Sequence, residues 1–274
     1  MKALNQATTF ENATMDELRD QQRLNYVLCR LGLAILSFGL IVASISTLLS
    51  LPGAFRRGLI PGILGSEFWF WLDSTIPWSC LFGAYLLWGR WDHPSWQRRT
   101  GLFLMLNLVD VILWLTEHGD RLGLGVNDFG HPWFRHNLGQ ALGWAEFALI
   151  ASLCGDLLIH LGVERASEAG KATRSLAATG AAVWMILFLM RTDWKGGWPL
   201  GQRRFINMEM LLLYLGSTLI WTVTLIQATS LAIAATRQCH EVVTEMRRDD
   251  ELLGQFASPQ DPDFDASPGP SWAD

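Results

Sequence analysis

Residues 31–51 read LGLAILSFGLIVASISTLLSL, a run without a single charged side chain. An α-helix rises about 1.5 Å per residue, so a run of this length crosses the ~30 Å apolar core of a lipid bilayer. Further apolar runs follow along the chain, separated by short charged or aromatic segments. The sequence therefore predicts an all-α integral membrane protein rather than a soluble domain.

Counting these runs predicts a bundle of about six transmembrane helices. The predicted spans are Leu31–Leu51, Phe68–Trp88, Leu102–Leu115, Leu138–Leu161, Leu176–Met190 and Ile206–Ala235. The third and fifth are short or polar, so we expect them to be buried among the other helices rather than to face lipid. Tryptophans lie close to several of the predicted ends, where an indole ring favours the headgroup region.

The same pattern divides the chain into four segments. These are 1–24, an N-terminal segment with an amphipathic helix; 25–236, the six-span bundle; 237–256, a helical extension; and 257–274, a disordered acidic Pro-rich tail. Thr14 and Glu17 have the spacing of a capping box, which predicts that a helix begins there and continues into the first span. Of the 21 Lys and Arg residues, 13 fall on the side of both termini and eight on the other, which predicts cytoplasmic termini in a cytoplasmic-type membrane.

Composition excludes several classes of function. The 274 residues are 50% hydrophobic and 17% charged, with a formal net charge of −5 and no basic tract, so we expect no nucleic-acid partner. The four cysteines are scattered without C-x-x-C spacing, which favours reduced packing residues. We find no hydrolase elbow, phosphate-binding loop, dinucleotide fingerprint or kinase signature, so catalysis has no visible basis in the sequence.

Carboxyl groups inside the predicted spans are candidates for an ion or proton relay, because ionisable groups at bilayer depth are costly. Asp110, one turn after Asn107, and Glu146 each lie about 12 Å below the end at which their span begins, close to the midplane. Two facing carboxyls in a low dielectric would share a proton. Alternatively, each is neutral or hydrogen-bonded to neighbouring side chains. Asp73 and Glu209 would line an outward vestibule of the same path.

Two glycines on the fourth span suggest close helix packing. Gly139 and Gly143 form a Gly-x-x-x-Gly pair, which lets a second helix approach closely and allows a homodimer.

Histidines near the outer ends of consecutive spans suggest a weaker possibility, a site for zinc or another divalent ion. Its ligands would be His118, His131 and His136 together with Glu117. The spacing lacks the short His-x-x-x-His pattern of strong metal motifs, and no paired histidines lie in the core to hold haem.

The two ends of the chain carry the features expected of a partner-binding protein. Val242, Val243 and Met246 form an apolar face on the C-terminal extension. This face would pack on the N-terminal helix or on a partner, or the extension is a solvated helix end held by ion pairs. Phe264 and Trp272 stand alone in the acidic tail, which is either a short docking motif or a solubilising end.

These observations lead to one main functional prediction and two alternatives. The main prediction is a non-catalytic accessory, scaffold or sensory subunit that engages a membrane or cytoplasmic protein through its cytoplasmic ends. The first alternative is a proton- or cation-coupled carrier or channel that uses Asp110 and Glu146. The second is an intramembrane metal site at the outer histidines. The sequence indicates no cofactor.

Overall fold

The computed structural model describes residues 2–55, 61–91, 93–123, 132–190 and 208–257, with side chains placed over 18–49, 67–91, 93–123, 138–186 and 215–252. Over these ranges the chain folds into six α-helices and no strand. The helices are α1 Lys2–Phe55, α2 Pro61–Leu87, α3 Pro94–His118, α4 Pro132–His160, α5 Ala166–Met190 and α6 Met208–Ala257. The predicted all-helical fold is confirmed.

Four helices in the described part of the chain are long and apolar enough to cross a membrane. Their candidate spans are Leu18–Leu49, Pro94–His118, Leu138–His160 and Leu215–Leu252. They overlap the first, third, fourth and sixth runs predicted from the sequence, and the second and fifth runs fall in α2 and α5. The protein is therefore a helical protein with four candidate membrane-spanning helices.

Prolines and glycines mark several helix ends. The helices α2, α3 and α4 each begin at a proline, whose missing amide hydrogen is not needed in the first turn. After α2 and α4 the chain turns at Gly89 (φ 69°) and Gly162 (φ 84°), a conformation that side chains with a Cβ rarely adopt. The predicted capping box at Thr14 is wrong, because α1 already begins at Lys2 and the amides at Thr14 have acceptors within the helix.

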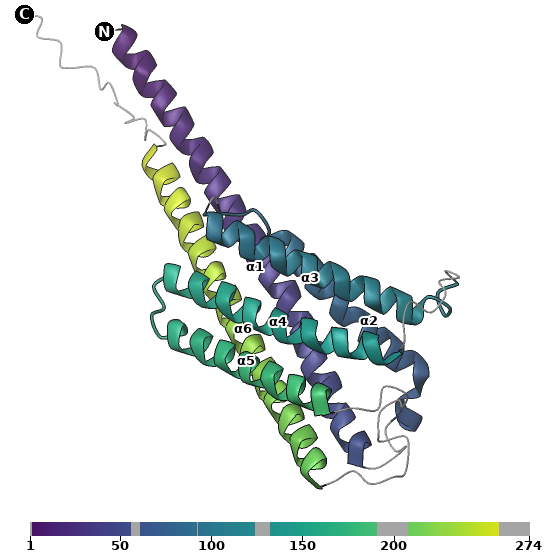
Figure 1. Ribbon diagram of the computed structural model, residues 1–274. Coiled ribbons are helices and arrows are strands. Elements are labelled where there is room, and N and C mark those ends of the chain that lie inside the picture. The colour runs from purple at the N-terminus through teal and green to yellow at the C-terminus, as the bar shows by residue number, and fades with distance from the viewer. Residues whose placement is uncertain (1, 56–60, 92, 124–131, 191–207, 258–274) are drawn as a thin grey trace, which may run out of the picture.

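The helices pack in two groups joined along α6. The helix α1 contacts α2 and α6, whereas α4 packs on α5 and both contact α6. The helix α3 contacts α2 and α4 and so bridges the two groups (Figure 1). The core that results is formed by buried side chains from all six helices, with Leu33, Leu36, Phe103 and Ile150 among the largest.

Glycine makes the closest helix crossings possible, at positions other than those predicted. A Cβ added to Gly83 of α2 would lie 2.9 Å from the carbonyl oxygen of Gly32 in α1, so these backbones touch. Gly155 of α4 and Gly170 of α5 meet in a similar way, with 3.5 Å from an added Cβ on Gly155 to the Cα of Gly170.

Gly139 makes no close helix contact within the described part of the chain, where no atom lies within 4 Å of a Cβ built on it. Its predicted role in a homodimer stays a prediction. At Gly143, the absent side chain leaves room for the ring of Trp221 from α6, which an added Cβ would overlap. A Gly-x-x-x-Gly pattern identifies small residues but does not say whether a backbone or an aromatic ring fills the space above them.

The expectation that the third span is buried among the other helices is also wrong. Its apolar window is only 22% buried, against 39–56% for the other three candidate spans. The polar residues of α3 lie toward one side, where Asn107 is buried, while the opposite side carries exposed Leu102, Met105 and Ile112. Polar residues in a helix require only one shielded face, so α3 can lie at the edge of the bundle. The helix α5 is likewise buried along one face only.

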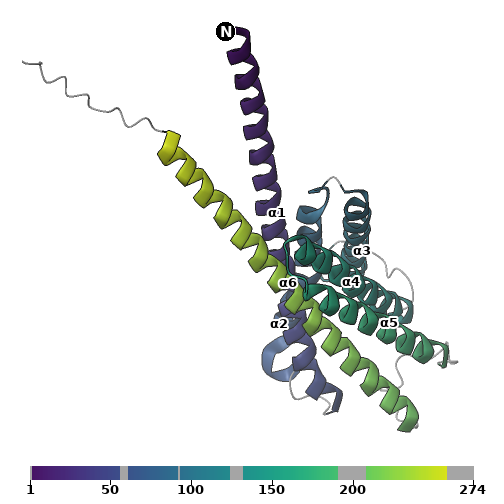
Figure 2. The ribbon, with the colours of Figure 1, turned by 90° about the vertical axis from the view of Figure 1, so that its left-hand side faces the viewer.

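The first and last helices extend far beyond the rest of the protein. At 54 and 50 residues, α1 and α6 are about 80 and 75 Å long, more than twice the thickness of a bilayer core. Their free ends lie at the same end of the molecule and diverge from each other (Figures 1 and 2). We call residues 18–30 of α1 and 237–252 of α6 the terminal helix pair.

Candidate functional site

Asp110 of α3 and Glu146 of α4, the two carboxyls singled out in the sequence, lie within electrostatic range of each other, and Cys80 of α2 lies within range of both. Glu146 Oε1 is buried and has no hydrogen-bond partner among the placed residues. Three helices thus bring two acids and a thiol into one buried region, which we call the Asp110–Glu146 pair.

Asn107 uses one of its two amide hydrogens within its own helix. The residue is 1% exposed, and Nδ2 donates to the carbonyl oxygen of Phe103 over 2.8 Å. An ionised carboxylate buried without a partner is costly, so a region of this kind favours a shared proton or a bound cation.

Asp73 lies in a second polar group. This group is in the region where the first half of α2 meets the end of α3, away from the terminal helix pair. Its carboxylate is within electrostatic range of His118 and Glu117 and hydrogen-bonds with Ser46 of α1. The His118 ring stacks on Trp114 with centroids 4.8 Å apart, and its Nδ1 lies 3.0 Å from the Trp114 carbonyl oxygen. Three helices again contribute to one polar group. The predicted role of Asp73 in an outward vestibule stays a prediction.

The predicted metal site is described only in part. His131 lies outside the described residues, and the side chain of His136 is not placed. Within the part of the chain that carries placed side chains, no three His, Cys, Asp or Glu residues are close enough to hold a metal ion. Glu117, His118 and Asp73 interact electrostatically, but these three described side chains are not close enough to one another to hold a metal ion. Glu209 belongs to α6, but its side chain also falls outside the placed ranges.

The apolar face of the C-terminal extension packs within the chain. Val242, Val243 and Met246 are partly buried against the hydrophobic core. Polar contacts hold the same two helices together: Arg23 Nη1 donates to Asp250 Oδ2 over 3.0 Å, and Arg30 Nη1 lies 2.9 Å from His240 Nδ1. The terminal helices therefore contact each other, and the predicted role of this face in binding a partner stays a prediction.

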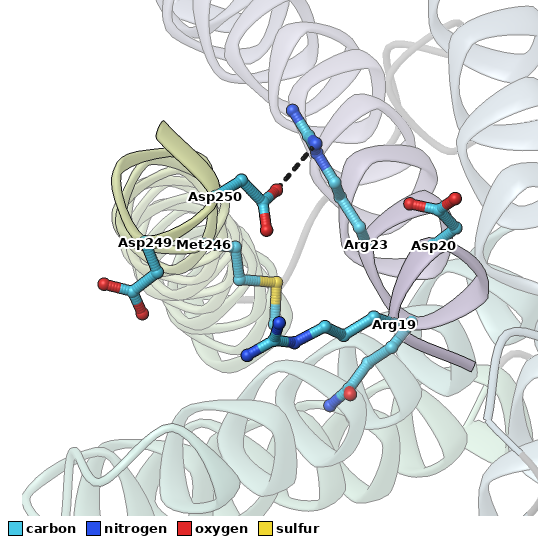
Figure 3. A pocket seen from close by; sticks show the side chains of 7 residues that line it. Arg19, Asp20, Arg23, Met246, Asp249 and Asp250 are labelled. Atoms are coloured by element: carbon cyan, nitrogen blue, oxygen red, sulfur yellow. Dashed lines mark hydrogen bonds and ion pairs between the residues drawn. The ribbon is translucent and has the colours of Figure 1, made fainter. Parts of the chain in front are cut away.

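A charged pocket opens where these helices begin to diverge. It has a volume of about 530 Å³ and lies between α1 and α6. Its lining is Arg19, Asp20, Gln22, Arg23, Met246, Asp249 and Asp250. Figure 3 shows Arg23 and Asp250 joined across it, with the Arg19 side chain extending beneath Met246 toward α6. The tail residues Phe264 and Trp272 lie outside the described residues.

Sequence reasoning missed a cluster of thiols in the same helix pair. Cys29 of α1 and Cys239 of α6 are completely buried and hydrogen-bond to each other, and Cys154 of α4 is close to Cys239. All four cysteines are free and buried, as predicted. Because the three clustered residues come from three helices, no spacing in the sequence could have revealed that they meet.

No family model, curated protein or solved structure matches this chain. Its function must therefore be argued from its own side chains.

Proposed function

We propose that this chain is a six-span membrane protein with both termini in the cytoplasm. On this proposal it acts as a non-catalytic accessory, scaffold or sensory subunit whose terminal helix pair receives a partner protein. The observation that carries the proposal is the joint extension of α1 and α6 beyond the other four helices, with a charged pocket at their divergence.

Three features support six spans and cytoplasmic termini. Besides the four candidate spans, α2 and α5 are helices of 27 and 25 residues that contain apolar runs, long enough to cross a bilayer core. An even number of crossings agrees with the free ends of α1 and α6 lying at the same end of the molecule. The larger share of Lys and Arg on that side favours the cytoplasm.

The pocket offers a partner both charge and a small apolar surface. Met246 supplies the apolar floor, and Arg23 and Asp250 already neutralise each other. Arg19 and Asp249 then present opposite charges on the two helices, at positions a partner helix or peptide would meet. Charges at the edge of an interface govern specificity and the association rate more than they govern affinity.

The experiment compares two identical charge reversals on exposed arginines. Arg19→Glu changes the pocket, whereas Arg247→Glu changes a residue of α6 that pairs with Glu251 on the exposed surface. We expect Arg19→Glu to weaken recovery of a specific partner about tenfold and Arg247→Glu to leave it unchanged. Equal recovery of the partner with both variants would exclude the charged pocket as the docking surface.

A second candidate function is supported by the Asp110–Glu146 pair. We propose it as a proton or cation relay, since the two carboxyls lie within electrostatic range and one buried oxygen lacks a partner in the described structure. Asp110→Asn and Glu146→Gln would then abolish a gradient-driven flux in liposomes, whereas Glu168→Gln on the exposed start of α5 would not. A wild-type protein without proton or cation flux would refute this candidate and leave the first intact.

A further inference from the structure

A second pocket, separate from the terminal helix pair, lies where the α2–α3 connection meets the end of α4. Its volume is about 510 Å³, within the range of small-ligand sites. Trp91 at its wall contacts Tyr26 of α1, with ring centroids 5.8 Å apart. Tyr26 precedes the apolar run that begins at Leu31, so the pocket lies at the level where the first span passes from polar to apolar sequence.

One wall of the pocket is aromatic and fixed in place. Trp91 and Trp96 meet edge to face, with centroids 4.6 Å apart. Trp96 is buried, and its Nε1 donates to the carbonyl oxygen of Leu87 over 3.3 Å. Leu157 of α4 continues this apolar wall. The rings are therefore held by contacts within the protein and do not have to reorganise to receive a ligand.

The opposite side carries nitrogen donors around a preoriented arginine. Arg99 forms an ion pair with Asp156, Nη1 also donates to Ser152 Oγ over 2.7 Å, and Nε donates to the Ser95 carbonyl oxygen over 3.1 Å. The imidazoles of His93 and His160 line the same pocket. Among the described lining residues Asp156 is the one carboxylate, and it pairs with Nη1 of Arg99. Nη2 of Arg99 makes only a 3.4 Å contact with Ser95 Oγ, so it keeps hydrogen-bond donors for a ligand.

An apolar strip on α3 leads away from this polar end. Residues three or four apart share a helix face, so Ser95 and Arg99 are followed along one face by Leu102, Leu106 and Val109. Leu102 is 53% exposed and Val109 38% exposed. This face of α3 therefore has polar donors at one end and exposed apolar side chains at the other. An amphipathic ligand has the matching arrangement, with a polar group at one end and an apolar chain at the other.

We propose that this pocket binds the headgroup of an anionic phospholipid, with its phosphate at Arg99, His93 and His160 and an acyl chain along the α3 strip. A guanidinium is the side chain best suited to phosphate, because it offers several donors in a fixed plane. The aromatic wall contacts the glycerol and upper acyl region, where indole rings favour the membrane interface. The site does not depend on the partner proposed above.

The test uses the full chain purified in detergent, freed of lipid and titrated with dioctanoyl phosphatidylglycerol. Bound lipid is counted by native mass spectrometry. We expect Arg99→Gln to weaken binding about tenfold or more, because it removes a charge-assisted hydrogen bond. Arg98→Gln is the matched control, since Arg98 is the exposed neighbour and does not line the pocket.

Two further variants separate binding from folding. Arg99→Gln combined with Asp156→Asn removes the cation without leaving a carboxylate unpaired, and we expect it to bind as weakly as Arg99→Gln alone. His160→Asn, at an exposed position, should also weaken binding. If Arg98→Gln and Arg99→Gln lower affinity equally, the attraction is only surface charge and the proposal fails.

The ligand class is tested in parallel. Dioctanoyl phosphatidylcholine should bind at least tenfold more weakly than phosphatidylglycerol. Equal affinity for the two lipids would show that the negative headgroup is not recognised and would overturn the proposal. Displacement of phosphatidylglycerol by millimolar inorganic phosphate would identify a soluble-anion site instead, which would also overturn it.

Discussion

The crossing of α1 and α2 at Gly32 and Gly83 leads to a quantitative prediction about which glycine tolerates alanine. The Gly-x-x-x-Gly motif in the sequence would predict the opposite ranking. A Cβ on Gly83 would lie 2.9 Å from the Gly32 carbonyl oxygen, 3.0 Å from Leu36 Cβ and 3.1 Å from Leu36 N. None of these atoms belongs to the far end of a flexible side chain, so none can rotate away. Gly83→Ala therefore requires the two helices to separate.

The size of the effect follows from two opposing contributions. Overpacking a tight contact costs about 1–3 kcal/mol, whereas replacing glycine by alanine within a helix stabilises it by about 0.5–1 kcal/mol. We expect Gly83→Ala to lower the free energy of unfolding by about 1–2 kcal/mol. At Gly139, where no atom of the described residues lies within 4 Å, the same substitution should raise it by about 0.5–1 kcal/mol.

The assay is reversible unfolding of both variants in mixed micelles with increasing mole fraction of dodecyl sulfate, followed by far-UV circular dichroism. The comparison is direct because the two changes are chemically identical and differ only in what the added methyl group meets. Destabilisation by Gly139→Ala, or equal stability of the two variants, would refute the packing described for α1, α2 and α4.

Three further predictions concern contacts made by α6. The Arg23–Asp250 ion pair, with side chains 39% and 46% exposed, should give a coupling energy of about 0.2–1 kcal/mol in a double-mutant cycle measured in the same micelles. A membrane-permeant dithiol oxidant such as diamide should join Cys29 to Cys239, and mass spectrometry of the digested protein should find that cross-linked peptide. Trp221→Ala should lower the free energy of unfolding by about 3 kcal/mol, because the indole fills the space above a glycine and packs on two aromatic rings.

Each of these three predictions can be contradicted by a comparison with other residues of the same protein. A coupling as large for the Arg247–Glu251 pair, which is 72% and 63% exposed, would mean that the terminal helices contribute nothing specific to the ion pair. Cross-links of Cys80 in place of the Cys29–Cys239 link would place the wrong helices together. Trp71, which is 66% exposed, should tolerate alanine with a much smaller loss than Trp221.

Local sequence patterns predicted the helices well because an apolar run of about 20 residues has few alternatives to a helix in lipid. Sequence patterns failed where the environment of a residue depended on which atoms of a neighbouring helix face it. Gly139 and Gly83 are both helical glycines, yet only Gly83 meets a backbone. The exposure of α3 was missed for the same reason, since its Asn107 and Asp110 suggested an enclosed helix.

The same distinction holds for the candidate sites: features of a single helix could be predicted from the sequence, whereas contacts between helices could not. The depth of Asp110 and Glu146 could be calculated from helix rise alone, but whether the two interact could not, and the structure places them within electrostatic range of each other. The apolar face at Val242 and Val243 was visible from spacing, but its contact with the rest of the chain was not. The thiol cluster and the interfacial pocket join residues from different helices, and a single sequence carries no signal for such contacts.

The most direct test of the account is the side of the membrane on which the terminal helix pair lies. Single cysteines placed at Asp20, Asp249 and Leu122, all exposed positions, can be labelled with a membrane-impermeant maleimide in intact and permeabilised cells. The account predicts labelling at 20 and 249 only after permeabilisation, and labelling at 122 in intact cells. Labelling of 20 and 249 on opposite sides would require an odd number of crossings and would contradict a terminal helix pair in the cytoplasm.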